Sequence, residues 1–208
     1  ILPIRFIAES FKFAVDWDEK TETITITKDF ADVADNSEAT TPDTSKGGKT
    51  LVVYYSASGS TAKVAEYIKN AANADIFELE PVDKYSDADL NWTNSSSRVN
   101  AEHEDESKRD IKLKNTTVPN WENYDTVFIG YPIWWGDMPM ILYTFFESYD
   151  FSGKTIITFN THGGSGFSNT VSTIRSLEPD ATVVEGLSIS RNHIQDAKDE
   201  IVEWVNGL

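Results

Sequence analysis

Residues 56–61, SASGST, combine hydroxyl side chains with a central glycine between an apolar run and a helical pattern. Hydroxyl groups and the free N–H groups at a helix start bind anions, and glycine lets the backbone approach a ligand closely. No lysine follows Gly59 and no G-x-G-x-x-G is present, so a Walker loop and a dinucleotide fingerprint are excluded. A nucleophile elbow would need glycine at position 56, which is serine. The segment therefore indicates a phosphate-binding turn, or else a serine-rich helix cap.

Two further segments suit a flat ligand. In YPIWWGDMP, residues 131–139, Trp134 and Trp135 stand side by side in an expected turn. A buried core seldom places two indoles in a turn, because each N–H needs a partner. A planar aromatic ligand explains both rings, although a core or interface role stays open. THGGSGFSN, residues 161–169, is glycine-rich with one histidine, so its backbone N–H groups can reach the edge of a ring; an ordinary loop is the alternative.

The elements that must position these segments alternate along the chain. Apolar runs predict strands over 50–56, 75–81, 125–132, 155–161 and 182–189. Helical periodicity predicts helices over 61–73, 139–149, 168–177 and 193–205. This alternation indicates an open, doubly wound parallel sheet. Ligands bind such sheets at the carboxyl ends of the strands, where the three segments fall, so we expect them to meet in one crevice.

Residues 83–120 interrupt the alternation with a long, polar and poorly periodic stretch where a helix would be expected. Loops of this length inside compact domains are typically functional or mobile.

A turn for a single phosphate, an aromatic turn and a glycine loop facing a ring edge are together the parts of an FMN site. On these motifs residues 49–208 resemble the flavodoxin family, in a short-chain-like bacterial branch. The resemblance implies an α/β fold, with a five-stranded parallel sheet in the order 2-1-3-4-5, and FMN as cofactor. The cofactor-binding positions that it implies come from the three segments: Ser56, Ala57, Ser58, Gly59, Ser60, Thr61, Pro132, Ile133, Trp134, Trp135, Gly136, Thr161, His162, Gly163, Gly164 and Phe167.

One departure from the family pattern concerns the outer flavin face. Many flavodoxins cover it with a tyrosine of the third loop, and none stands there in this chain. Phe167, or Trp92 from residues 83–120, is the candidate replacement; otherwise the face is open to a substrate. Trp134 is the expected stacking ring, with Trp135 as the second candidate.

Residues 1–28 differ in character. They predict a short helix over 3–11 and a hairpin, and they resemble part of the N-terminal repeat of copper amine oxidase-type and bacterial surface proteins. The stretch has no histidine and no cysteine, so no copper chemistry is implied. Residues 29–48 are a linker by composition, and the flavodoxin-like domain covers 49–208. The resemblance is compatible with an extracytoplasmic or cell-surface location, and a cytoplasmic one stays open.

The charge balance restricts the partners. With 34 acidic against 18 basic residues the net charge is −16, which argues against nucleic acid and favours a basic protein partner. No apolar run approaches the roughly 18 residues of a membrane span. Cysteine is absent, which excludes disulfides and thiolate metal sites, and we predict no metal site.

Three function classes follow. The first is an FMN-dependent electron carrier that docks a basic redox partner. The second is an FMN-dependent NAD(P)H reductase for quinone-like acceptors, and the third is a non-catalytic surface or interaction module. No catalytic side chain is predicted for any of them.

Overall fold

The computed structural model describes residues 13–18, 23–28 and 48–208, within two compact units, Ile1–Ser45 and Lys46–Leu208. In the first unit, strand β1 (Phe13–Asp18) pairs antiparallel with β2 (Thr23–Lys28). The predicted helix over 3–11 and nearly all of the predicted linker lie outside the described residues.

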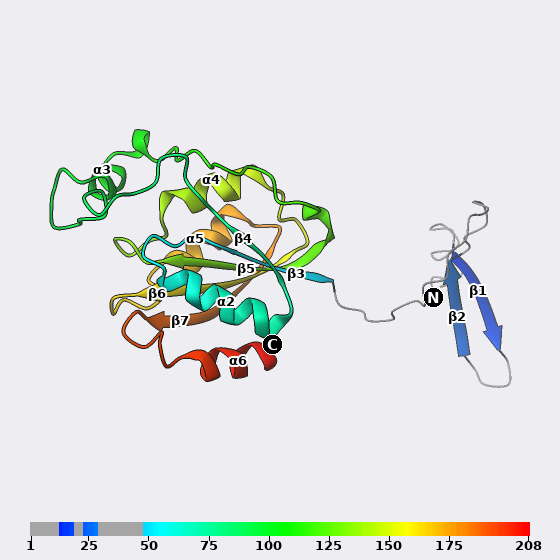
Figure 1. Ribbon diagram of the computed structural model, residues 1–208. Helices are drawn as coiled ribbons and strands as arrows, with labels where there is room; N and C mark the ends of the chain where they lie inside the picture. Colours follow the sequence, from blue (N-terminus) through cyan, green and yellow to red (C-terminus); the bar gives the residue numbers. More distant parts are fainter. Residues whose placement is uncertain (1–12, 19–22, 29–47) are drawn as a thin grey trace. The chain divides into compact units, whose positions relative to one another are not determined.

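The second unit is built on a five-stranded parallel sheet (Figure 1). Its strands are β3 (Lys49–Tyr54), β4 (Asp75–Glu78), β5 (Tyr124–Pro132), β6 (Thr155–His162) and β7 (Thr182–Ser190). They lie in the order β4-β3-β5-β6-β7, which confirms the predicted 2-1-3-4-5 arrangement. The middle strands β3, β5 and β6 are mostly buried, as expected of apolar runs covered on both faces.

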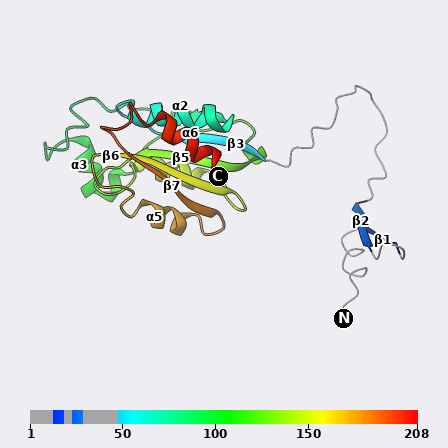
Figure 2. The ribbon, with the colours of Figure 1, turned by 90° about the horizontal axis from the view of Figure 1, so that it is seen from below.

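Helices cover both faces of this sheet, as Figures 1 and 2 show. On one face α2 (Ser60–Ala72) and α6 (Lys198–Asn206) bury Val64, Ile68 and Ile201. On the other, α4 (Met140–Ser148) and α5 (Thr170–Leu177) bury Phe145 and Ile174. The last helix begins at Lys198 and not at the predicted residue 193, because residues 191–196 form turns. In these turns His193 N donates to Ser190 O (2.8 Å) and Asp196 N donates to His193 O (3.0 Å).

Gly130 marks a close approach within the sheet. A Cβ atom at this position would lie 2.0 Å from the ring of Phe159 on the neighbouring strand β6. Phe159 is fully buried, so its ring has no room to move aside. Glycine is therefore required here by packing.

Residues 83–120, called the insertion below, are not a bare loop. They contain helix α3 (Arg98–Glu104) and the 3-10 turn η1 (Glu106–Lys108), and the turn η2 (Trp121–Asn123) follows them. An antiparallel bridge between Pro81 and Leu113 closes the insertion at its neck, where Val82 N donates to Lys112 O (2.8 Å). Figure 1 shows α3 beyond the carboxyl ends of the strands. Among the described residues no helix is long and apolar enough to cross a membrane.

Candidate functional site

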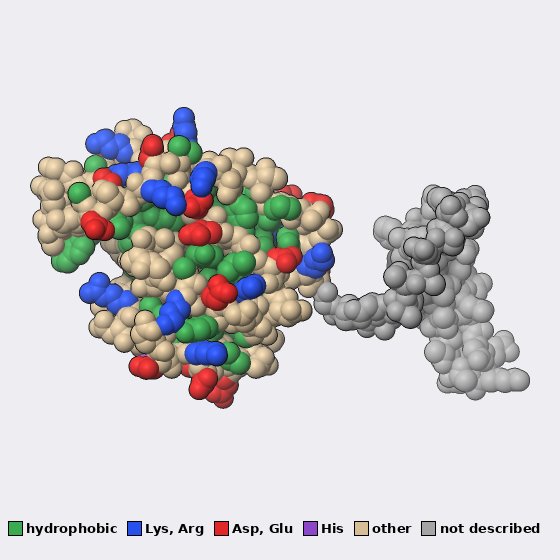
Figure 3. Space-filling model, viewed as in Figure 1, with side chains coloured by type: hydrophobic (Ala, Val, Ile, Leu, Met, Phe, Trp, Pro, Cys, Tyr) green, Lys and Arg blue, Asp and Glu red, His purple; other side chains and the backbone are tan. Residues whose placement is uncertain are grey.

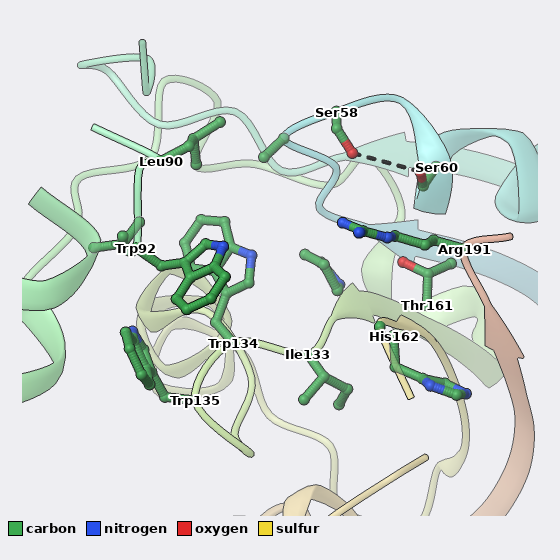
Figure 4. A pocket seen from close by; sticks show the side chains of 14 residues that line it. Ser58, Ser60, Leu90, Trp92, Ile133, Trp134, Trp135, Thr161, His162 and Arg191 are labelled. Carbon is green, nitrogen blue, oxygen red and sulfur yellow. Dashed lines mark hydrogen bonds between the residues drawn. The ribbon is translucent and has the colours of Figure 1, made fainter. Parts of the chain in front are cut away.

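A cavity of about 640 Å³ lies at the carboxyl ends of β3, β5 and β6 (Figure 4). Its lining comes from all three segments singled out in the sequence, from the insertion and from the turn after β7. The lining residues are Ala57, Ser58, Ser60, Leu90, Trp92, Val99, Pro132, Ile133, Trp134, Trp135, Thr161, His162, Gly163 and Arg191. The sequence-predicted residues Ser56, Gly59, Thr61, Gly136, Gly164 and Phe167 are outside this lining.

The hydroxyl-rich turn leads into the N-terminus of α2. Gly59 is the residue before the helix and has φ 83°, a conformation that glycine adopts without strain. Thr61 is 1% exposed, and its Oγ1 lies 2.8 Å from Oγ1 of Thr161, which ties the first segment to the third. The Oγ of Ser56 is buried without a hydrogen-bond partner among the described residues. A buried hydroxyl of this kind is one that a ligand can satisfy.

The tryptophan pair sits in a tight turn. Trp134 N donates to Asp137 O (2.8 Å) and Asp137 N donates to Trp134 O (2.9 Å). The two central residues, Trp135 and Gly136, have φ 54° and 77°, as a type I′ turn requires. Glycine accepts this conformation, whereas for tryptophan it carries strain of about 1 kcal/mol. The turn therefore holds Trp135 outward at a local cost in backbone energy.

The two indoles have different surroundings. Trp134 packs edge-on against Tyr55 and Tyr85, with ring centroids 5.7 and 5.3 Å away. Trp135 is 48% exposed and stacks on His103 of α3, with centroids 5.3 Å apart and planes 19° apart. Trp134 is thus fixed by the core, and Trp135 lies between the cavity and the insertion.

The insertion provides one wall of the cavity through Leu90, Trp92 and Val99. The Trp92 ring meets Trp135 edge-on at 6.4 Å, and 66% of the residue is exposed. Of the two side chains expected to cover the outer face of a flavin, Trp92 lines the cavity and Phe167 does not. Sequence reasoning missed Leu90 and Val99, because the insertion shows no helical periodicity from which to place them.

A buried carboxylate anchors the insertion. Glu102 is 5% exposed and accepts hydrogen bonds from Arg98 Nε and from the Tyr85 hydroxyl, both at 2.6 Å. The Arg98 guanidinium also lies 4.0 Å from the centre of the Tyr85 ring. Burial, and then the bond to Glu102, raise the pKa of Tyr85, so its hydroxyl stays protonated as the donor.

The glycine loop holds His162 in one tautomer. Its Nδ1 accepts a hydrogen bond from Gly164 N (2.9 Å), which leaves the ring proton on Nε2. Burial lowers the pKa of His162, so the ring is neutral at neutral pH. The loop therefore presents neutral donors to the cavity.

Arg191 is a lining residue that the sequence reasoning missed. It follows β7, and its backbone N donates to His162 O (2.9 Å). Figure 4 shows its side chain pointing into the cavity on the side of the hydroxyl-rich turn. The signal was available, because the carboxyl end of the fifth strand borders the same edge of the sheet.

The fold and the cavity define a doubly wound α/β protein with a cavity at the carboxyl edge of its parallel sheet, where such folds bind ligands. The family model described as Flavodoxin matches residues 49–208. The chain therefore belongs to the flavodoxin family. That model leaves residues 1–28 unmatched, so their resemblance to the copper amine oxidase-type repeat stays a prediction.

Solved structures agree with this family. A candidate flavoprotein from Bacteroides uniformis is 37% identical to this chain and superposes with a TM-score of 0.70. The match covers 77% of this chain and 99% of the relative. A second from Bacteroides eggerthii is 36% identical, with a TM-score of 0.63, covering 74% and 98%. A Lactobacillus acidophilus flavoprotein that was solved in complex with FMN is 24% identical to this chain, with a TM-score of 0.55, and shares the fold. The match covers 72% of this chain and 98% of that relative. No match was found among curated proteins.

Proposed function

We propose that this protein binds FMN in the cavity and serves as an electron carrier. The observation that carries the proposal is that the hydroxyl-rich turn, the tryptophan turn and the glycine loop open into one cavity. Its volume of about 640 Å³ lies within the usual range of cofactor pockets. Membership of the flavodoxin family and the relative solved with FMN support the same cofactor.

The residues present fit a monophosphate at one side of the cavity. The hydroxyls of Ser58 and Ser60 line the cavity at the N-terminus of α2. The buried, unpartnered Oγ of Ser56 comes just before them in the chain, outside the lining. The N–H groups there and the helix dipole favour an anion. Among the residues that the structure describes, no carboxylate lines the cavity, although the chain is strongly acidic. This side therefore suits the 5′-phosphate.

The remaining lining residues fit a planar ring system. Trp134, held edge-on by two tyrosines, offers a fixed apolar surface, and Trp135 with Trp92 offers exposed indole edges and faces. The backbone of Gly163 lies at the cavity beside them, and the neutral ring of His162 adds no positive charge on that side. FMN, when bound, supplies the redox chemistry, while the protein binds it, orients it and excludes water.

An acidic protein surface supports a basic redox partner, because opposite charges steer association. The net charge of the whole chain is −16, yet the face seen in Figure 3 carries basic and acidic side chains interspersed. The docking surface of such a partner is therefore expected on a face richer in carboxylates than this one.

A second candidate function is an FMN-dependent NAD(P)H reductase for a small quinone-like acceptor. The observation that favours it is the pair of exposed indoles at the cavity, Trp92 at 66% and Trp135 at 48% exposure. Exposed aromatic surface of this kind can receive a planar acceptor.

A flavin titration followed by an anaerobic assay separates these functions. We expect the protein to bind FMN and to exchange electrons with a redox protein, without oxidising NADPH by itself. Quinone-dependent NADPH oxidation would instead support the reductase. Protein that stays colourless after incubation with FMN would refute both and favour a non-catalytic module.

A matched pair of serine variants ties the binding to this cavity. Ser58→Ala should weaken FMN binding by about tenfold or more, because a hydrogen bond to a charged group contributes about 1.5–3 kcal/mol. Ser176→Ala removes a hydroxyl that bonds only within α5 and should leave the affinity unchanged. Equal affinities for both variants would place the flavin elsewhere.

A further inference from the structure

We infer that Arg191 pairs with the phosphate of the flavin and thereby makes the cavity select FMN over the unphosphorylated riboflavin. This inference rests on the proposed function, and it assigns to the turn after β7 a part in ligand choice. It concerns a residue outside the three segments that carry the rest of the cavity.

The placement of Arg191 follows from the sheet. It is the first residue after β7, and the bond from its backbone N to His162 O fixes its main chain beside the glycine loop. Its side chain points into the cavity on the side of the hydroxyl-rich turn (Figure 4). Residues farther along the same turn also reach α2, since Gln195 hydrogen-bonds Lys63 of its first turns. The turn after β7 therefore lies next to the expected phosphate position.

The charges of the cavity single out this residue. Among the described residues that line the cavity, Arg191 is the one with a permanent charge, and none is acidic. Lys63 is nearby on α2, but its ammonium group is engaged by Gln195. In a chain of net charge −16, the surrounding field opposes the entry of an anion, so one cation at the phosphate position has a large relative effect.

The guanidinium is also available. No hydrogen bond or ion pair joins it to another side chain in the part of the chain that the structure describes. Arg98, in contrast, is committed to Glu102. A planar guanidinium can donate two parallel N–H bonds to phosphate oxygens, which hydroxyl groups cannot do. Riboflavin has no phosphate, so its affinity does not depend on this residue.

The test compares Arg191→Gln with the unaltered protein in fluorescence titrations with FMN and with riboflavin, at low and at high salt. Arg191→Gln should weaken FMN binding by about tenfold or more, because the loss of even one of the two hydrogen bonds to a charged group has that effect. The affinity for riboflavin should stay the same, and the FMN affinity of the variant should fall less steeply with salt. Arg191→Lys should give an intermediate FMN affinity, because lysine keeps the positive charge but cannot donate two parallel N–H bonds.

Arg175→Gln is the matched control. Arg175 lies on α5 outside the cavity lining, and it donates to the carbonyl of Val183. The substitution Arg175→Gln removes the same charge from the chain and should leave the affinities for FMN and for riboflavin unchanged. Circular dichroism checks that each variant is folded. The inference is refuted if Arg191→Gln binds FMN as tightly as the unaltered protein, if it weakens both flavins equally, or if Arg175→Gln shows the same loss. Failure of the unaltered protein to bind either flavin would refute the proposed function itself.

Discussion

Replacing Arg98 by methionine should loosen the insertion without unfolding the sheet. Arg98 donates to Glu102 at 2.6 Å and to Asp83 O at 2.8 Å, and its guanidinium covers the Tyr85 ring. After the substitution, the carboxylate of Glu102 keeps the Tyr85 hydroxyl but loses its cation while staying buried. The penalty should fall on the insertion, because these contacts all lie within residues 83–102.

The magnitude follows from the burial of the pair. Removing one partner of a fully buried ion pair costs about 3–5 kcal/mol. The Arg98 side chain is 26% exposed, so water screens part of the interaction and we expect about 2–3 kcal/mol. Local opening of the insertion should therefore become about 30- to 150-fold more frequent.

Hydrogen–deuterium exchange read by mass spectrometry measures this opening directly. Peptides from residues 86–104 should exchange faster in Arg98→Met by the stated factor, whereas peptides from β3, β5 and β6 should keep their protection. Lys84→Met is the control, because Lys84 pairs with Glu80 on the surface and its loss should change no exchange rate measurably. Equal protection of residues 86–104 in Arg98→Met and the unaltered protein would show that the buried pair does not hold the insertion.

Three further predictions concern other parts of the molecule. Trp135→Asn should keep or raise the melting temperature, because asparagine tolerates φ 54° better than tryptophan does, and it should weaken FMN binding. A clearly lower melting temperature would contradict the strain assigned to this turn. Gly130→Ala should lower the free energy of unfolding in urea by about 2–3 kcal/mol, because its Cβ would meet the buried Phe159 ring, and an unchanged urea midpoint would disprove this packing argument. Burial, and then the charge of Asp150, raise the pKa of Glu178 from 4.5 to about 7, so the folded state favours its protonated form and loses stability as the pH rises from 4.5 to about 7. Glu178→Gln should therefore be more stable than the unaltered protein above pH 7, by no more than about 1 kcal/mol given its partial exposure, and equal to it below pH 4.5 in thermal melts.

The sheet was predictable because its signal is local. Strands such as β3 and β5 are continuous apolar runs, and burial on both faces requires that composition. The order of the strands then followed from the family resemblance and is confirmed. The end of the second strand was less predictable, because β4 ends at Glu78 and not at the predicted residue 81. Leu79 N still donates to Tyr54 O of β3 (2.7 Å), but Pro81 already pairs with Leu113 at the neck of the insertion.

The insertion was not predictable, because pairwise polar contacts hold it together. Asn100 is buried, and its Nδ2 donates to the backbone carbonyls of Trp92 (3.0 Å) and Asn94 (2.7 Å). Glu102 is buried through its bonds to Arg98 and Tyr85. Arg98 and Glu102 have the i,i+4 spacing of a helix, but the contacts to Tyr85, Trp92 and Asn94 follow no period. A polar stretch of this kind gives nearly the same sequence pattern as a solvated loop.

The site shows the same division. The hydroxyl-rich turn and the tryptophan turn were singled out by residue type, and both contribute residues to the cavity lining. Arg191 carries no motif, and only its position after a parallel strand indicates the cavity. The bond between the Thr61 and Thr161 hydroxyls joins residues 100 positions apart, a contact that no local pattern encodes.

The closed neck of the insertion gives the molecule a modular design. Because Pro81 and Leu113 pair, the chain between them leaves and rejoins the rest of the domain at one place, and it can be regarded as a cap on the cavity. The rest of the domain contributes the turns at the strand ends, and the cap contributes Leu90, Trp92 and Val99. Exchanging residues 82–112 for the equivalent piece of a relative is therefore expected to change the wall that faces the ring of the proposed flavin, while Ser58, Ser60 and Arg191 on the proposed phosphate side are kept.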